Sequence, residues 1–95
     1  MKSETKEKIS EAITKILGVE FSDISGRTYQ RRVNYARDMF CYFIRKETDA
    51  TFAETGLLLD RNRSTAYDSV AKIEGLRSAY NWVEDDINNI ESELK

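Results

Sequence analysis

The sequence predicts an all-α fold, a small bundle of about five helices that contains a helix-turn-helix. Apolar residues recur at spacings of three and four along most of the chain, which is the period of a helix. Proline, which breaks helices, is absent, and four glycines leave little room for the many turns of a β-fold. The 95 residues are enough for one domain, 1–95, whose modest core needs no disulfide bonds.

The first predicted helix begins at Ser3 and ends at Gly18, two residue types that are favoured at the respective ends of a helix. Lysines line its outer side, and the link of residues 19–26 adds a few apolar side chains to the core. This is the pattern of an amphipathic helix that faces the core. Its apolar face consists of Ile9, Ala12, Ile13, Ile16 and Leu17.

A basic loop opens at Arg27, and a long helix rich in aromatic residues follows it to about Thr48. The aromatic residues predict the centre of the domain rather than a ligand site, because they share one helical face with aliphatic side chains. Cys41 lies in this apolar run and is the only cysteine, so we expect a buried thiol and no disulfide framework. The inner face comprises Tyr29, Val33, Ala36, Met39, Phe40, Phe43 and Ile44.

Residues of about 51–74 have the pattern of a helix-turn-helix. Thr51 and Glu54 have the spacing of a capping box, and turn-favouring residues follow at 60–62. The second helix is entered through a cationic, hydroxyl-rich turn, which is how a recognition helix meets DNA. The same spacing also fits an ordinary helical hairpin whose arginines are solvated. The apolar stripe of the second helix is Ala66, Val70 and Ile73.

An acidic helix with a heptad-like apolar stripe is predicted at about 76–94. Gly75 and the region from Ser78 to Asn81 are weak points, so the stripe fits either one long helix or two collinear ones. The stripe must be buried, and packing within the domain is preferred over the alternative, a homodimer formed by two such stripes. Its members are Ile73, Leu76, Tyr80, Val83, Ile87, Ile90 and Leu94.

The charge distribution favours a nucleic-acid partner more than the net charge does. The whole chain carries −2, which argues against binding a polyanion. Residues 27–63, however, hold eight Arg or Lys against five Asp or Glu, a local balance of +3. Residues 64–95 hold three against seven, a balance of −4. A local basic face matters more for phosphate contact than the total charge.

The composition argues against an enzyme and against a metal or cofactor. Histidine is absent and cysteine occurs once, so zinc sites and Ser-His or Cys-His catalysis lack their residues. A glycine loop that could cradle nucleotide phosphates is missing, and no small-molecule substrate is expected. The sequence has neither an apolar stretch of about 18 residues nor a signal peptide, so we expect a cytoplasmic protein without membrane contact.

Residues 31–76 resemble the C-terminal, DNA-binding domain of the bacterial replication initiator DnaA. The stretch reads RRVNYARDMFCYFIRKETDATFAETGLLLDRNRSTAYDSVAKIEGL, and a weaker similarity reaches back to about Ile9. The family pattern runs from a basic loop and a helix through K-E-T-D to the signature R-D-H-T/S-T-V and a final K-I-x-x-L. The resemblance implies a helical domain that binds a short box in double-stranded DNA. In that family the recognition helix enters the major groove, and a loop arginine enters the adjacent minor groove.

The resemblance also implies which residues contact the phosphate backbone. Arg31 and Arg37 match family arginines that lie near it. Arg45 and Thr48 match a basic residue and a threonine that touch phosphates. With the neighbouring arginines of the loop, the cations expected at the backbone are Arg27, Arg31, Arg32, Arg37 and Arg45.

The same resemblance assigns base recognition to the start of the second helix of the helix-turn-helix. Arg61, Ser64 and Thr65 match the signature, and Thr65 is expected to hold a phosphate together with the first amides of the helix. The Asp-His pair of the family is Asn62-Arg63 here, so an acceptor for cytosine is replaced by donors. Asparagine suits adenine and arginine suits guanine, and a changed base preference is expected.

Two functions follow from these patterns. The leading one is sequence-specific binding of double-stranded DNA, in replication initiation or its regulation. The alternative is a protein-interaction module that binds an initiator or a regulator and dimerises through the C-terminal stripe. The acidic total charge and the loss of the Asp-His pair favour this alternative.

Overall fold

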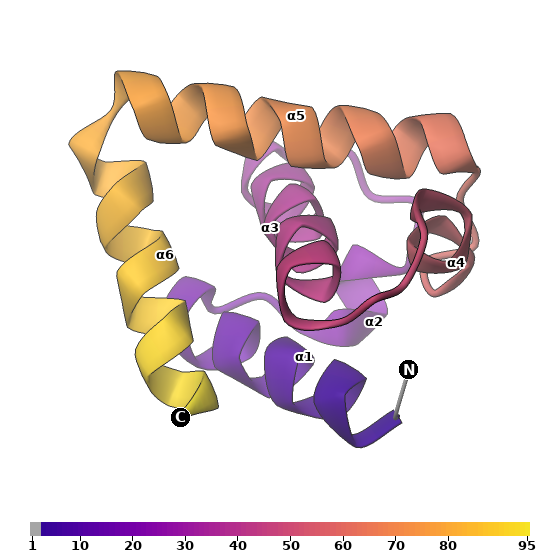
Figure 1. Ribbon diagram of the computed structural model, residues 1–95, viewed down its shortest axis with the longest axis horizontal. Coiled ribbons are helices and arrows are strands. Elements are labelled where there is room, and N and C mark those ends of the chain that lie inside the picture. Colours follow the sequence, from indigo (N-terminus) through magenta and orange to yellow (C-terminus); the bar gives the residue numbers. More distant parts are fainter. Residues whose placement is uncertain (1–2) are drawn as a thin grey trace.

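The computed structural model describes residues 3–95, and these form six α-helices (Figure 1). The predicted all-α class is confirmed, and none of the described residues lies in a strand. There are more helices than the five predicted, because part of the expected link at 19–26 forms one helical turn. No helix in residues 3–95 is both long and apolar enough to pass through a membrane. The helices are α1 (Ser3–Leu17), α2 (Phe21–Ile24), α3 (Arg31–Glu47), α4 (Phe52–Leu57), α5 (Arg63–Ala79) and α6 (Asn81–Leu94).

Helix α3 is the centre of the fold, as its aromatic residues predict (Figure 1). Every residue from 36 to 44 is buried, and Met39, Phe40 and Phe43 have no exposed surface. A helix that is buried on all sides needs neighbours all around it, and α1, α2, α4 and α5 pack against it. The thiol of Cys41 is buried in this core, as its apolar surroundings predict.

Polar contacts fix the orientation of α3 against the two C-terminal helices. Asp38 accepts a hydrogen bond from Ser69 Oγ at 2.7 Å, and Lys72 Nζ lies 3.4 Å from its other carboxylate oxygen. Tyr35 donates its hydroxyl to Asp86 at 2.7 Å, which ties α3 to α6. Asp38 is buried, so desolvation raises the pKa of its carboxyl group. Buried polar groups that have found their partners favour one arrangement of the helices over others.

The acidic helix predicted at about 76–94 is wrong in its bounds, because the chain turns within this stretch. Helix α5 runs on to Ala79, the backbone is extended at Tyr80 with φ −134° and ψ 124°, and α6 begins at Asn81. The break therefore lies at Tyr80, inside the weak region expected from Ser78 to Asn81, and not at Gly75, which is inside α5. One extended residue is enough to redirect the chain, and α6 runs down the side of the domain instead of continuing α5 (Figure 1).

The C-terminal half of the heptad-like stripe is buried inside the domain. Val83, Ile87 and Ile90 are at most 1 % exposed, and α6 packs against α1. Packing within the domain, the preferred expectation, is what the structure shows. A homodimer formed through Val83, Ile87 and Ile90 would have to displace this packing, because these side chains already belong to the core.

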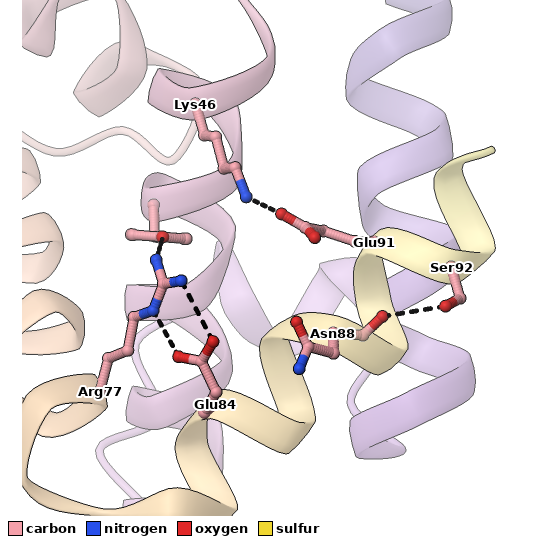
Figure 2. Close-up of polar contacts among 7 residues, drawn as sticks. Lys46, Arg77, Glu84, Asn88, Glu91 and Ser92 are labelled. Carbon is pink, nitrogen blue, oxygen red and sulfur yellow. Dashed lines mark hydrogen bonds and ion pairs between the residues drawn. The ribbon is translucent and has the colours of Figure 1, made fainter.

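Exposed ion pairs hold α6 against its neighbours from the outside (Figure 2). Arg77 of α5 bonds both carboxylate oxygens of Glu84, at 2.5 and 3.2 Å, and donates to the hydroxyl of Tyr42 at 2.9 Å. Lys46 of α3 pairs with Glu91. The hydrogen bonds of the first pair raise the pKa of Arg77 and lower the pKa of Glu84. Ion pairs at exposed positions add little stability, so the buried apolar face anchors α6 and the pairs orient it.

Replacing Ile87 by aspartate should destabilise the fold rather than dissociate a dimer. Ile87 is 1 % exposed, and an unpaired carboxylate at a buried position should lower the free energy of unfolding by about 3 kcal/mol or more. Urea unfolding followed by circular dichroism measures this loss. Asn89→Asp adds the same charge at an exposed position of α6 and is the matched control. Light scattering gives the contradicting outcome. If the parent chain were a dimer and Ile87→Asp a stable monomer, Ile87 would lie at a dimer interface and not in the core.

Cys41 should react with iodoacetamide only when the protein opens. Burial is the main cause that raises the pKa of this thiol to about 12, so its thiolate is scarce at neutral pH. We expect slow labelling in native buffer and fast labelling in urea, as measured by mass spectrometry. Equal rates in the two conditions would show that the thiol is accessible in the folded state.

Candidate nucleic-acid interface

The helix-turn-helix consists of α4 and α5, and α4 begins with the predicted capping box. Thr51 Oγ1 accepts a hydrogen bond from the Glu54 N–H at 3.0 Å, and the Glu54 carboxylate accepts one from the Thr51 N–H at 2.8 Å. These contacts lower the pKa of Glu54. They also satisfy two amides that the start of a helix leaves unpaired, which stabilises a helix of six residues.

Backbone hydrogen bonds make the turn between α4 and α5 tight. The N–H groups of Leu59 and Arg61 both donate to the carbonyl of Gly56, each at 2.9 Å. Asp60 adopts the left-handed conformation, with φ of 55°, which aspartate tolerates better than most residues. A Cβ at position 56 would lie 2.7 Å from the carbonyl oxygens of Arg61 and Asn62, so this close approach requires glycine. The turn therefore fixes the angle at which α5 leaves α4.

Asn62 is the N-cap of α5, and the helix begins at Arg63 rather than at Arg61. Asn62 Oδ1 accepts hydrogen bonds from the Thr65 N–H at 2.9 Å and from the Thr65 hydroxyl at 3.0 Å. Both lone pairs of that oxygen are in use, so the expected bidentate contact of Asn62 with adenine is not available while it caps the helix. Thr65 was expected to hold a DNA phosphate, but its N–H and its hydroxyl both donate to Asn62 in this cap. In the protein without DNA this pair builds the start of the helix, and its contacts with DNA stay a prediction.

The outward face of the first turns of α5 carries side chains that can meet base edges. Arg63 and Ser64 are exposed on it. Tyr67 and Asp68, which the sequence reasoning missed, join them around a shallow hollow of about 200 Å³. Tyr67 is 56 % exposed and packs edge-on against Phe52 of α4, with ring centroids 5.3 Å apart. The signal was present in the sequence, because Tyr67 is a large aromatic residue that lies off the apolar stripe of its helix.

Arg37 of α3 holds the basic loop in place. Its side chain is 6 % exposed. Nε donates to the Ile24 carbonyl at 2.7 Å, and Nη1 donates to Asn34 Oδ1 at 2.6 Å. Burial is the main cause that lowers the pKa of Arg37, although an arginine stays charged at any ordinary pH. Nη2 is directed at three further carbonyls, those of Asp23 at 3.4 Å, Gly26 at 3.3 Å and Thr28 at 3.2 Å.

Arg37 is therefore a structural residue of the loop, which corrects its expected place near the phosphate backbone. Arg61 has a related role at the turn of the helix-turn-helix. Its Nη1 donates to the Leu59 carbonyl at 2.7 Å, and its Nη2 donates to the Gly26 carbonyl at 2.5 Å. The oxygen of Gly26 thus accepts hydrogen bonds from both arginines. This contact joins the basic loop to the turn between α4 and α5.

Arg45 and Thr48 shape the connection between α3 and α4. Arg45 Nη1 donates to the Ala50 carbonyl at 2.6 Å, and the guanidinium lies 4.1 Å from the ring centroid of Phe52. Thr48 donates its hydroxyl to the Ile44 carbonyl at 2.6 Å and accepts from the Ala50 N–H at 3.1 Å. Both side chains have their partners inside the protein, so the structure does not support the phosphate contacts that the resemblance implies for them.

Four of the expected arginines are exposed, namely Arg27, Arg31, Arg32 and Arg63. Arg31 and Arg32 begin α3, at the end of the helix where the dipole is positive. Positive side chains at that end are unfavourable for the helix. Residues that lower local stability are often kept for a function, which makes Arg31 and Arg32 candidates for binding an anion. Arg32 uses one donor for the carbonyl of Gly18, at 2.9 Å.

A groove of about 300 Å³ lies between the basic loop and α5. Tyr29 and Arg37 line its loop side, and Arg61 and Thr65 line its other side. Tyr29 is 75 % exposed, which corrects its expected place on the inner face of the long helix. The reason is that α3 begins only at Arg31, so Tyr29 still belongs to the loop. The loop and the first turns of α5 therefore lie on the same side of the protein.

The family model for the helix-turn-helix of the bacterial dnaA protein matches residues 6–73. The match runs from α1 through the basic loop to α5 and covers most of the chain. The chain belongs to the bacterial DnaA helix-turn-helix family. No curated protein and no solved structure matches the chain.

Membership of the DnaA family confirms the resemblance of residues 31–76 and supports DNA binding in replication initiation. The DnaA helix-turn-helix is a DNA-binding domain and not a catalytic one. Three positions differ from the DnaA signature. Asn62 and Arg63 are the cap and the first residue of α5, and Ala66, where the signature has valine, is buried. The departure from the family therefore falls at the end of α5 that carries the exposed face. Helix α6 lies outside the residues that the family model matches.

Arg37→Ala should destabilise the protein, because it removes five hydrogen bonds from a buried side chain. We expect the free energy of unfolding in urea to fall by about 2–4 kcal/mol. Arg31→Ala, at an exposed position of the same helix, is the matched control and should change it by less than about 0.5 kcal/mol. If the two variants were equally stable, the loop would not depend on Arg37.

Proposed function

We propose that this chain binds a specific sequence in double-stranded DNA, with the start of α5 in the major groove and the basic loop at the adjacent minor groove. The observation that carries the proposal is the carbonyl of Gly26, to which both Arg37 and Arg61 donate. This contact keeps the loop and α5 together, as two elements that meet neighbouring grooves must be. The family match supports DNA binding independently of this geometry.

In this proposal, the exposed arginines of the loop and of α3 neutralise phosphates. Arg27, Arg31 and Arg32 have their guanidinium groups on the surface, and phosphate contacts fix position on the duplex without reading its sequence. The first amides of α5 add the positive end of a helix dipole. The net charge of −2 does not prevent this, since the local balance of residues 27–63 is +3.

Base recognition is assigned to the exposed face of α5. Arg63 can make a bidentate contact with guanine through its two terminal nitrogens. Asp68 lies beside it around the same hollow and can accept a hydrogen bond from the amino group of cytosine. The aromatic ring of Tyr67 can contact a thymine methyl group. A face with these three side chains offers both donors and acceptors, which sequence-specific recognition needs.

Selection from a pool of random duplexes, followed by fluorescence anisotropy on the enriched site, tests this function. Arg63→Ala should cost about 1–3 kcal/mol on that site and relax the preference at one base pair. Arg31→Ala should weaken all duplexes alike and lower the slope of affinity against salt by about one.

The matched control is Lys15→Ala, which removes an exposed cation from α1, on the opposite side of α3 from α5 (Figure 1). It should leave DNA affinity unchanged. If no sequence were enriched by the parent chain, the proposal of sequence-specific binding would fail. If Arg63→Ala weakened selected and random duplexes equally, Arg63 would be a backbone contact instead of a base reader.

The second candidate function, a protein-interaction module, needs a different surface from the one first expected. Its expected surface, the stripe of α6, is buried against α1. One observation still favours an additional protein partner, namely a groove with a partly exposed tryptophan at the junction of α3, α5 and α6.

A further inference from the structure

This second groove, of about 570 Å³, lies where the start of α3, the second half of α5 and the start of α6 meet. Two of its apolar side chains, Leu76 and Trp82, come from residues beyond the family match at 6–73. The groove is therefore completed by residues outside the matched segment, although Leu76 still falls within the resemblance of residues 31–76. Its lining consists of Arg31, Arg32, Tyr35, Lys72, Leu76 and Trp82.

The floor of the groove is aromatic and only partly covered. Trp82 is 53 % exposed, and Tyr80 beside it is 50 % exposed. The ring centroids of Trp82 and Tyr35 are 5.6 Å apart, and those of Trp82 and Tyr80 are 5.9 Å apart. The hydroxyl of Tyr35 is held by Asp86 at 2.7 Å, so its ring is fixed in place. Preformed pockets that contain tryptophan and tyrosine are typical of the energetic centre of protein interfaces.

The rim of the groove is positively charged. Arg31 and Arg32 stand on one side and Lys72 on the other, and all three side chains are exposed. Two carboxylates at the start of α6 already have partners, since Asp86 accepts from Tyr35 and Glu84 pairs with Arg77. Lys72 is shared with Asp38, and Arg32 uses one donor for the Gly18 carbonyl. Among the residues that the structure describes, no carboxylate forms an ion pair with Arg31 or Arg32. An apolar floor with a cationic rim is complementary to an acidic ligand that carries an apolar anchor.

We propose that this groove binds an acidic segment of a partner protein. A leucine or a similar side chain would sit between Tyr35, Leu76 and Trp82, and flanking carboxylates would meet Arg31 and Arg32. A single DNA strand fits these observations less well. Bases stack on open ring faces in succession, whereas Tyr35 stands at 52° to Trp82 and an aliphatic side chain completes the floor.

The groove shares Arg31 and Arg32 with the proposed DNA-binding face, so an acidic partner and DNA compete for the same two cations. This competition rests on the proposed function, but occupation of the groove does not. The partner would thus weaken DNA binding without touching the face of α5 that reads bases. The negative charges of the bound partner also repel the DNA phosphates. The loss of DNA affinity that the partner causes should therefore be largest at low salt, where screening is weakest.

Selection of short random peptides on the immobilised 95-residue chain tests the proposal. We expect the enriched peptides to combine several Asp or Glu with one or two large apolar residues. The best peptide is then made without tryptophan and titrated against the chain. Trp82 is the only tryptophan in the sequence, so its emission reports occupation of the groove directly.

Two charge reversals at exposed positions separate the groove from the base-reading face. Arg31→Glu should weaken the peptide roughly fivefold or more, since a favourable charge contact becomes a repulsive one. Arg63→Glu is the matched control, because Arg63 does not line the groove. It should leave peptide affinity unchanged while it removes DNA binding. In the parent chain, the peptide should lower the apparent affinity for DNA.

Several results would overturn the proposal. Enrichment of no peptide class, or of basic peptides, would remove the acidic partner. Trp82 emission that responds to a single-stranded oligonucleotide but not to the peptide would assign the groove to nucleic acid. Equal weakening by Arg31→Glu and Arg63→Glu would mean that the peptide does not occupy the groove. A chain that binds the peptide as expected but enriches no duplex would refute the proposed function and leave the groove assignment standing.

Discussion

One carbonyl oxygen, that of Gly26, connects the two parts of the proposed DNA-binding surface. Arg37 reaches it from inside the domain and Arg61 reaches it from the turn of the helix-turn-helix. A surface loop has few hydrogen bonds of its own, and a buried guanidinium with several carbonyl acceptors supplies them. A buried arginine is tolerated only when its donors are satisfied. The loop, the turn and the start of α5 therefore depend on the same set of contacts.

Helix α3 positions the basic loop, the start of α5 and the aromatic groove. Arg37 and Asp38 are neighbours in its sequence, and the first holds the basic loop while the second holds Ser69 of α5. At its N-terminus, Arg31 and Arg32 border the aromatic groove and belong to the proposed DNA-binding face. A buried helix is suited to this task, since its side chains point in all directions and close packing on every side prevents it from moving. The two proposed anionic ligands would therefore meet at one end of a single rigid element.

Much of the fold could be predicted, because it depends on residues that are close in sequence. The capping box of Thr51 and Glu54 lies within one helical turn. Periodic apolar residues likewise identified α3 as the buried centre. The direction of α6 could not be predicted in this way, since the stripe continues through Tyr80 with the correct spacing. A periodic pattern reports which side of a helix is apolar, but it does not show where a single extended residue turns the chain.

The sequence by itself determined the all-α class, the helix-turn-helix and the basic character of residues 27–63. Tertiary structure alone decided which arginines face solvent. Arg31 and Arg37 belong to one helix and match equally well as phosphate contacts, yet the first is exposed and the second is buried. The difference arises from the carbonyls of residues 23–28, which the fold brings to Arg37. Contacts between separate segments depend on how the chain closes on itself, and local spacing carries no information about that closure.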